Sequence, residues 1–400
     1  MTRVSRLRQT AGGKRLGSGR AGVSVAVVLG VLALMIAGCG ATATSKKRAS
    51  GPSASSLAYV NRQVQKYEAI PQFVPPGPPV DAAQAKGDTW FSMPNSCSIV
   101  YDATIDGVEA KIAAQLGINF QEYCTANQVS QWVQGVGVAI SRHVNLFNLS
   151  NAPSPYELQP QLAQLQAAGI KTMMTHFLDQ SASLPPHLNA MVPAPFNLAG
   201  RLMADYVIAK TKGHAVVLNI NSPDLLPSKP QSAAMDQEFK TYCGSGCKVI
   251  TVNIPSVDWA TQIQSTVESY LHRYPQITYV VPNYDSEVEW VVPAITAVGH
   301  TGKVHVVTFN GTPFVLNDIE QEQGSIVQMD LGEDLSWLAY ADIDQGLRLL
   351  TGAKTLTTEN TPLRMFTAAN VAQAGTPPVV SKGFGGAFVG GYLKLWGVKG

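Results

Sequence analysis

Residues 278–313 have the sequence TYVVPNYDSEVEWVVPAITAVGHTGKVHVVTFNGTP and contain one complete strand, helix and strand unit. The β-branched run Thr278–Val281 is typical of a buried strand, and Ser286–Val298 has the longer apolar pattern of a helix. Gly299 follows where a left-handed residue would end the helix, and Val304–Phe309 forms the next strand. Strands joined by a crossing helix are parallel, so this segment predicts an α/β fold with a parallel sheet.

The same alternation extends through the chain from residue 88. Further helices are expected at Ala103–Leu116, Pro155–Ala168, Asn197–Lys210, Gln262–Tyr274 and Ser336–Leu350. Further strands are expected at Ile118–Tyr123, Val144–Leu149, Lys171–Thr175, Ala215–Asn219 and Val249–Val252. This pattern covers about 310 residues, more than one core usually supports, so we expect two doubly wound lobes.

The amino terminus has the features of an export signal. Its first twenty residues carry six Lys or Arg and no acid, and the run from Ala21 to Ala37 is uncharged. Ile36-Ala37-Gly38-Cys39 resembles the lipobox of bacterial lipoproteins, in which the cysteine thiol receives the lipid. We therefore expect residues 1–38 to be a lipoprotein signal peptide and Cys39 to anchor the protein to the outer face of the bacterial cell membrane. The alternative is an ordinary signal peptide with a chance cysteine.

Residues 39–87 differ in composition from the rest of the chain. They are rich in Ala, Ser, Gln and Pro, and they include the proline-rich run Val74–Val80 without a periodic apolar face. Prolines favour an extended path, so this segment predicts a lipid-anchored tether between the membrane and the folded body.

The charge balance gives no support for nucleic-acid binding. The chain has 29 Lys+Arg and 27 Asp+Glu, and loss of the six positive charges of the signal changes the formal net charge from +2 to −4. A mildly acidic protein has no electrostatic footprint for nucleic acid, and we expect no such partner.

Export also determines how the cysteines are interpreted, because disulfides form in oxidising compartments. Apart from Cys39, four cysteines remain, and they allow three pairings. Their spacing favours Cys243 with Cys247 and Cys97 with Cys124, with free buried thiols as the alternative. No second close cysteine pair and no histidine at ligand spacing accompanies Cys243 and Cys247, so we expect no metal site.

The sequence contains none of the common local catalytic motifs. It lacks a phosphate-binding Gly-rich loop ending in Lys-Ser/Thr, a Gly-x-Ser-x-Gly elbow and a His-Glu-x-x-His zinc helix. We therefore expect a binding protein rather than an enzyme, with no cofactor. In a two-lobed α/β protein its cleft would lie at the carboxyl ends of the strands.

Residues 280–313, followed by 337–352, resemble the carboxyl-terminal half of the type I periplasmic sugar-binding proteins of bacterial ABC importers, the ribose and galactose group. The corresponding amino-terminal segments are similar to Asp106-Gly107, 165–170 and 204–210, and the likeness covers about residues 88–370. It implies two doubly wound parallel-sheet lobes joined by a three-crossover hinge. The amino-terminal lobe would comprise 88–195 plus 331–362, and the carboxyl-terminal lobe 196–330 plus 363–400. A monomer that closes on its ligand and docks on a membrane permease is implied.

The resemblance also places candidate ligand-binding residues. Tyr101 and Trp259 fall where aromatic rings stack on the two faces of a sugar, with core packing as the alternative for each. His176 and Phe177 occupy the positions at which an Asp–Arg pair usually holds hydroxyl groups. The remaining candidates are Phe196 and Tyr284, where Asn is common, and Asn310, where Asp is usual.

The acids left near this cleft are Asp285 and one of Asp330 or Glu333, although Asp285 could instead cap the following helix. Charge-assisted hydrogen bonds are roughly twice as strong as neutral ones, so their loss weakens sugar recognition or indicates a less polar ligand. The favoured function is an extracytoplasmic solute-binding lipoprotein of an ABC importer with a carbohydrate-like ligand. An envelope sensor feeding a receptor or kinase and an exported hydrolase are the alternatives.

Overall fold

The computed structural model describes residues 51–151, 153–321, 325–379 and 381–398. The expected signal peptide and Cys39 lie outside these residues. Within them, none of the helices combines the length and the apolar character that crossing a membrane would require.

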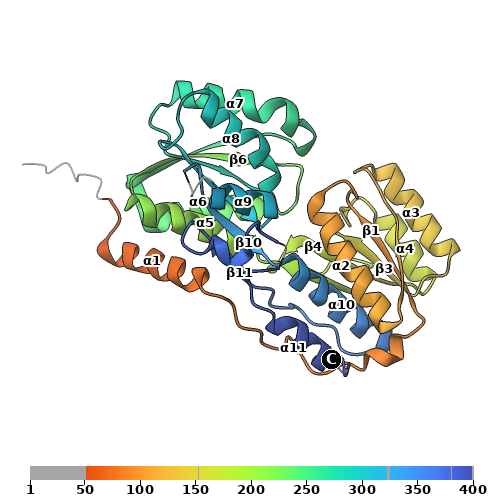
Figure 1. The fold of residues 1–400 in the computed structure, drawn as a ribbon. Helices are drawn as coiled ribbons and strands as arrows, with labels where there is room; N and C mark the ends of the chain where they lie inside the picture. Colours follow the sequence, from red (N-terminus) through yellow and green to blue (C-terminus); the bar gives the residue numbers. More distant parts are fainter. Residues whose placement is uncertain (1–50, 152, 322–324, 380, 399–400) are drawn as a thin grey trace, which may run out of the picture. The chain divides into compact units, whose positions relative to one another are not determined.

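The amino-terminal lobe is built on a parallel sheet in the order β2-β1-β3-β4-β5. Figure 1 labels β1, β3 and β4 of this sheet. Its strands are β1 (Thr89–Pro94), β2 (Asn119–Glu122), β3 (Leu146–Ser150), β4 (Lys171–Asp179) and β5 (Ala190–Ala194). The β2, β3 and β4 segments were predicted from their β-branched and aromatic residues, within a few residues at each end.

Helices cover both faces of this sheet. On one face, α2 (Val100–Leu116) and α10 (Leu335–Thr351) pack on Trp90. On the other, α3 (Val129–Ser141) and α4 (Gln159–Ala167) pack on Phe91. Adjacent strand residues point to opposite faces, so the continuous apolar runs of these strands supply both cores.

The carboxyl-terminal lobe has the sheet order β11-β10-β9-β8-β6-β7 and is parallel except for the pairing of β10 with β11. Its strands are β6 (Ala215–Asn221), β7 (Cys247–Asn253), β8 (Tyr279–Pro282), β9 (His305–Asn310), β10 (Val327–Glu333) and β11 (Leu363–Phe366). One face is covered by α5 (Phe196–Thr211) and α6 (Ser228–Glu238). The other is covered by α7 (Trp259–Arg273), α8 (Val288–Ala297) and α9 (Pro313–Gln321).

The chain passes between the two lobes at three places. These are between β5 and α5, between β10 and α10, and between α10 and β11. The second crossing occurs after Glu333, three residues later than the expected boundary, because β10 continues to Glu333 in the carboxyl-terminal sheet.

The prediction of an extended tether over 39–87 is wrong for its described part. Residues Ala54–Glu68 form helix α1, which packs on α5 with Val60 and Val64 buried, and Ser53 caps its first turn. This helix was not predicted because most of its residues are polar, although Val60 and Val64 have the i, i+4 spacing of a buried helical face.

Residues 69–80, which we call the strap, lead from α1 on the carboxyl-terminal lobe to the amino-terminal lobe. Phe73 packs against the rings of Trp337 and Tyr392, with centroids 5.7 and 5.1 Å away. The buried Arg348 guanidinium donates to the Pro78 carbonyl at 3.0 Å, and the Val80 N–H donates to the Leu395 carbonyl at 2.9 Å. The proline-rich run is therefore part of the folded body.

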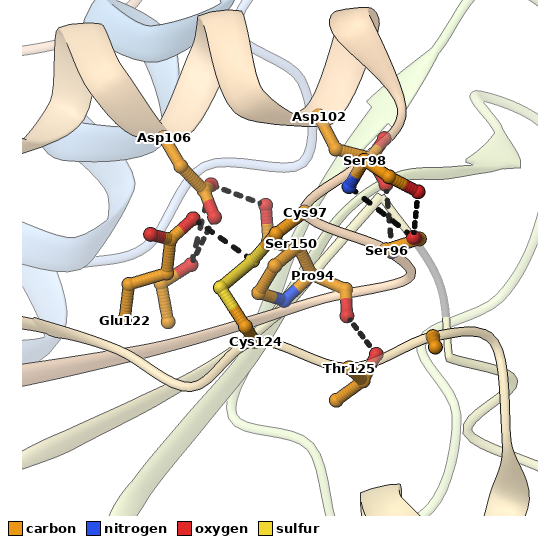
Figure 2. Close-up of a disulfide and its surroundings, with 12 residues drawn as sticks. Pro94, Ser96, Cys97, Ser98, Asp102, Asp106, Glu122, Cys124, Thr125 and Ser150 are labelled. Atoms are coloured by element: carbon orange, nitrogen blue, oxygen red, sulfur yellow. Dashed lines mark hydrogen bonds between the residues drawn. A yellow bond between two sulfur atoms is a disulfide. The ribbon is translucent and has the colours of Figure 1, made fainter.

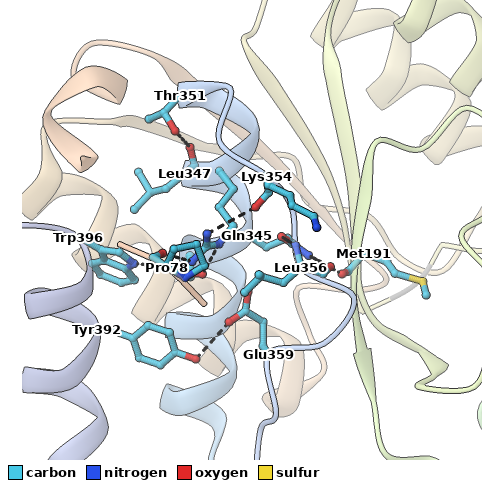
Figure 3. A network of polar contacts seen from close by, with 12 residues as sticks. Pro78, Met191, Gln345, Leu347, Thr351, Lys354, Leu356, Glu359, Tyr392 and Trp396 are labelled. Atoms are coloured by element: carbon cyan, nitrogen blue, oxygen red, sulfur yellow. Dashed lines mark hydrogen bonds and ion pairs between the residues drawn. The ribbon is translucent and has the colours of Figure 1, made fainter. Parts of the chain in front are cut away.

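The chain end also departs from expectation. Helix α11 (Ala387–Leu395) was assigned to the carboxyl-terminal lobe, but its Phe388 stacks on Trp337 of α10 at 4.7 Å. Figure 3 shows Tyr392 and Trp396 of this end beside α10 and Pro78 of the strap. Residues 387–398 therefore belong to the amino-terminal lobe, because their aromatic face completes the core around α10.

Candidate functional site

A cavity of about 890 Å³ is lined by residues of both lobes. In the amino-terminal lobe its wall includes Asn95 after β1 and Asn151 after β3. In the carboxyl-terminal lobe it includes Leu225 after β6, Ser256 after β7 and Tyr284 after β8. These are the carboxyl ends of the parallel strands, where open α/β sheets bind ligands. The cavity is the candidate binding site.

Most of the residues predicted to bind ligand line this cavity. They are Tyr101, His176, Phe177, Phe196, Trp259, Tyr284 and Asn310. They come from six segments that are far apart in sequence, and the fold brings them to one place. The exception is Asp285, which is fully buried and does not line the cavity.

Trp259 and Tyr284 form a fixed aromatic corner in the carboxyl-terminal lobe. Their ring centroids are 6.2 Å apart at an interplanar angle of 39°. The Trp259 Nε1–H donates to Ser222 Oγ at 2.9 Å, and the Tyr284 hydroxyl is 2.9 Å from Ser228 Oγ. Because these polar groups bond to the protein behind the wall, both rings are held in place.

Tyr101 connects the two lobes at the cavity wall. It lies in the first turn of α2, and its hydroxyl donates to Glu333 Oε2 at 3.0 Å at the end of β10. Burial raises the pKa of Glu333 to about 7, although His176, Tyr101 and Asn310 partly oppose this effect. Glu333 therefore changes charge close to neutral pH, beside the point where the chain crosses between lobes.

The side chain of His176 is hydrogen-bonded to a residue of its own lobe. Its Nε2 lies 2.8 Å from Asp342 Oδ2 of α10, and both side chains are fully buried. Burial alone lowers the pKa of His176, but the Asp342 carboxylate outweighs it, and the pKa is raised overall. His176 has a φ of 54° at an irregularity of β4, which allows this contact. Its Nε2 is therefore bonded within the lobe, whereas its Nδ1 is buried and has no hydrogen-bond partner among the described residues.

Asp285 shapes the loop after β9 instead of facing the cavity. Its carboxylate accepts from the Thr312 N–H at 2.8 Å, from the Thr312 hydroxyl at 2.7 Å and from the Thr308 hydroxyl at 3.1 Å. Asp330 accepts from the Gly311 N–H at 3.1 Å. Gly311 has a φ of 80°, which favours glycine. These two acids hold Asn310 and Thr312 in the wall, and the expectation that Asp285 faces ligand is corrected.

Asp285 and Asp330 also belong to a group of buried acids that contact each other, which we call the carboxyl pairs. Within the described residues they are Glu109 with Asp342, Asp330 with Asp285, Glu359 with Asp344, and Asp205 with Glu238. Burial is the largest cause that raises the pKa of each first-named residue, and a neighbouring carboxylate comes next. That neighbour is the partner itself in three pairs, whereas for Glu109 the carboxylate of Asp106 has a larger effect than that of Asp342. Two adjoining buried carboxylates cannot both be charged, so each pair retains a proton at neutral pH.

Both cysteine pairings favoured by the spacing are present as disulfides. Cys97–Cys124 has a Cα separation of 5.4 Å, and Cys243–Cys247 one of 5.7 Å. Figure 2 shows the first of these beside Asp106, whose carboxylate accepts from the Ser150 hydroxyl at 2.8 Å. This disulfide joins the loop after β1 to the loop after β2, and each loop contributes residues to the cavity wall.

Within the described residues, one group has metal-ligand spacing: Cys97, Glu122 and Cys124. Its two sulfur atoms are bonded to each other, so neither is a thiolate. Thiolates are the form in which cysteines bind metals, and the group therefore does not fit a metal ion.

The sequence analysis missed several polar residues of the wall. Asn95, Asn127 and Asn151 all line the cavity from the amino-terminal lobe. Asn151 could have been predicted, because it lies two residues after the expected strand Val144–Leu149, at the strand end where the cleft was expected. Asn127 had none, since its position depends on how the loop after β2 folds against the disulfide.

Comparisons with known proteins agree with this architecture. A family model described as "Periplasmic binding protein domain" matches residues 89–354. The solute-binding protein of the 5-methylthioribose transporter of Thermotoga lettingae TMO, in complex with 5-methylthioribose, is similar with a TM-score of 0.66 at 15% identity, over 80% of this chain and 95% of that one.

An ABC transporter solute-binding protein of Agrobacterium vitis with bound allitol gives a TM-score of 0.64 at 16% identity, covering 72% of this chain and 98% of that one. An ABC transporter solute-binding protein of Bacillus halodurans C-125 with bound myo-inositol gives a TM-score of 0.63 at 15% identity, covering 73% of this chain and 99% of that one. No curated protein sequence matches the chain. At these identities the similarity shows the fold, and the predicted two-lobed α/β class is confirmed.

Proposed function

Because the chain belongs to the periplasmic binding protein domain family, we propose that it captures a small sugar or sugar-like solute for a bacterial ABC importer. The observation that carries the proposal is the cavity lined by the strand ends of both lobes. The similar proteins from Agrobacterium vitis and Bacillus halodurans, which hold allitol and myo-inositol, support a carbohydrate-like ligand.

The proposed mechanism is closure of the lobes around the ligand. Tyr101 lies on the amino-terminal lobe, and Trp259 and Tyr284 lie on the carboxyl-terminal lobe. When the lobes close, these rings pack on opposite sides of the ligand, and its apolar faces leave water. The closed pair of lobes then presents a surface that the permease distinguishes from the open form.

We further propose that the protein acts outside the cytoplasm as a monomer anchored by lipid at Cys39. The basic and apolar run of residues 1–38 and its small residues before Cys39 support this location. The anchor keeps the binding body close to the permease, where captured solute is needed.

Deletion of the gene tests the importer role. The deletion strain should lose saturable uptake of the solute that stabilises the purified protein, and re-expression of the gene should restore that uptake. A ligand at about a hundredfold excess over its Kd adds about 2.7 kcal/mol to the free energy of unfolding, which identifies the solute in a thermal-shift screen. Uptake that persists while ligand-induced transcription is lost would indicate a sensor instead. Conversion of the ligand by the purified protein would indicate a hydrolase.

A further inference from the structure

We infer that the cavity binds a neutral ligand in which a planar aromatic ring is joined to a hydroxylated group, as in an aryl glycoside or a nucleoside. This inference rests on the proposed function and specifies its ligand. It comes from three properties of the cavity wall: its charge, the way its rings are held, and the kind of hydrogen bonds it offers.

The described part of the wall has no lysine or arginine that could bind an anion, and its one histidine, His176, is already paired with the Asp342 carboxylate at 2.8 Å. The acids Asp102, Glu289 and Asp318, in contrast, are present in the wall. Asp102 is buried and accepts from the Ser96 N–H at 3.1 Å, so it is engaged by its own loop. A phosphate or carboxylate on the ligand would find no lysine or arginine to pair with among these described residues, which disfavours anionic ligands.

The aromatic corner presents ring carbon to the cavity. The Trp259 N–H is used by Ser222, whose hydroxyl donates in turn to Glu287 at 3.1 Å. The Tyr284 hydroxyl is used by Ser228. With these polar groups bonded on the protein side, the two rings offer apolar faces and no hydrogen bond. A matching ligand supplies a flat apolar part, because stacked aromatic pairs add about 0.5–1.5 kcal/mol beyond the burial of area.

Opposite this corner, the amino-terminal lobe offers neutral hydrogen-bonding groups. Asn95, Asn127 and Asn151 line the cavity there. The Oδ1 of Asn151 is buried and has no hydrogen-bond partner among the described residues, so a ligand O–H or N–H would complete it. These are amide groups, whose bonds to hydroxyls are weaker than those of charged groups.

The two sides together define the ligand. The three asparagines of the amino-terminal lobe contribute little to binding a bare sugar, because each neutral hydrogen bond adds only about 1 kcal/mol net. A ring on the same molecule adds the apolar contact that the corner requires. The cavity volume of about 890 Å³ lies in the upper part of the usual range of roughly 300–1,000 Å³ for small-molecule sites, and it accommodates both parts.

Calorimetric titration of the purified mature protein tests this with matched probes. Phenyl β-D-glucoside is compared with D-glucose, adenosine with D-ribose, and adenosine with AMP. We expect at least one ring-bearing probe to bind ten or more times more tightly than its bare sugar, and AMP to bind at least ten times more weakly than adenosine. The first two comparisons distinguish an aryl glycoside from a nucleoside as the source of the ring.

Two tryptophan variants assign the effect to the corner. Trp259→Ala should weaken binding of the ring-bearing probe by about 30- to 1000-fold, the range for buried aromatic anchors, and should alter bare-sugar binding much less. Trp290→Ala is the matched control, because Trp290 is half-buried in α8 and does not line the cavity. If Trp259→Ala does not fold, the wild-type probe ratios alone decide.

Bare sugars that bind as tightly as their ring-bearing partners would overturn the inference. AMP that binds as tightly as adenosine would do the same, as would failure of both ring-bearing probes to bind. The importer role is judged separately by uptake in the deletion strain. A strain that loses uptake of a bare sugar upholds the importer role and refutes this inference.

Discussion

Two neighbouring glycines of α11 have different surroundings, and their replacement by alanine should therefore change the stability of the protein in opposite directions. A Cβ at Gly391 would lie 2.2 Å from Cε1 and 2.4 Å from Cδ1 of Phe73 in the strap. A Cβ at Gly390 would have no atom within 4 Å. Gly391→Ala must therefore push the Phe73 ring away from Trp337 and Tyr392, whereas Gly390→Ala moves nothing.

The magnitude follows from the two ring contacts. Each aromatic pair contributes about 0.5–1.5 kcal/mol, so loss of both costs about 1–3 kcal/mol. Both substitutions share the helix-propensity gain of about 0.5–1 kcal/mol for replacing glycine within a helix. The difference between the two variants removes that shared gain, and Gly391→Ala should be less stable than Gly390→Ala by about 1–3 kcal/mol.

Urea denaturation of wild type and the two variants measures this difference. A Phe73→Ala background supplies the control, because the penalty of Gly391→Ala should disappear once the ring is absent. Equal stability of the two alanine variants in the wild-type background, within about 0.5 kcal/mol, would refute the placement of the strap against α11.

Three other outcomes are expected. The carboxyl pairs and Glu333 keep protons in the folded protein that the unfolded chain releases near pH 4. The free energy of unfolding should therefore fall as pH rises from about 4 to 8. A series of denaturation curves in which the free energy of unfolding is greatest at pH 8 would contradict this. Replacing Cys97 and Cys124 by serine should lower the free energy of unfolding by about 3.5 kcal/mol, and replacing Cys243 and Cys247 should lower it by about 2 kcal/mol. The first disulfide has the larger effect because it closes a longer loop, with a sequence separation of 27 against 4. Urea denaturation of both double variants should show this order, and the reverse order would contradict it. Cys39→Ala should release the protein from the membrane fraction on cell fractionation, and a wild-type protein that is already soluble would rule out the anchor.

The strands and helices with clear apolar periodicity were predictable from the sequence. Lys171–Thr175 was recognised as a strand, but β4 continues to Asp179 through the irregularity at His176, which a tertiary contact with Asp342 stabilises. Helix α3 was not predicted, because Gly135 and Gly137 weaken its local signal. Gly135 is required by packing, since a Cβ there would lie 2.5 Å from Met93 Sδ.

The aromatic part of the candidate site was also predictable, whereas the roles of its polar residues were not. Trp259 and Tyr284 were placed at the cleft by the resemblance to sugar-binding proteins, and both line the cavity. The burial of Asp285 depends on Thr308 and Thr312, which come from the next strand and its loop. Local sequence does not determine whether a carboxylate faces a ligand or a neighbouring backbone, because that depends on how adjacent strands align.

The strap has a consequence for the smallest piece of this chain that can fold. The family match spans residues 89–354, yet Arg348 within it and Arg364 beyond it donate to main-chain oxygens of Pro78 and Glu68. Cutting the chain at the family boundaries would leave Arg348 buried without the Pro78 carbonyl. It would also remove Phe73 and Phe388, whose rings pack on Trp337. The segment shared with the family and the segment that folds stably are therefore different lengths of chain, and residues 89–354 without their flanks should be less stable than the whole body.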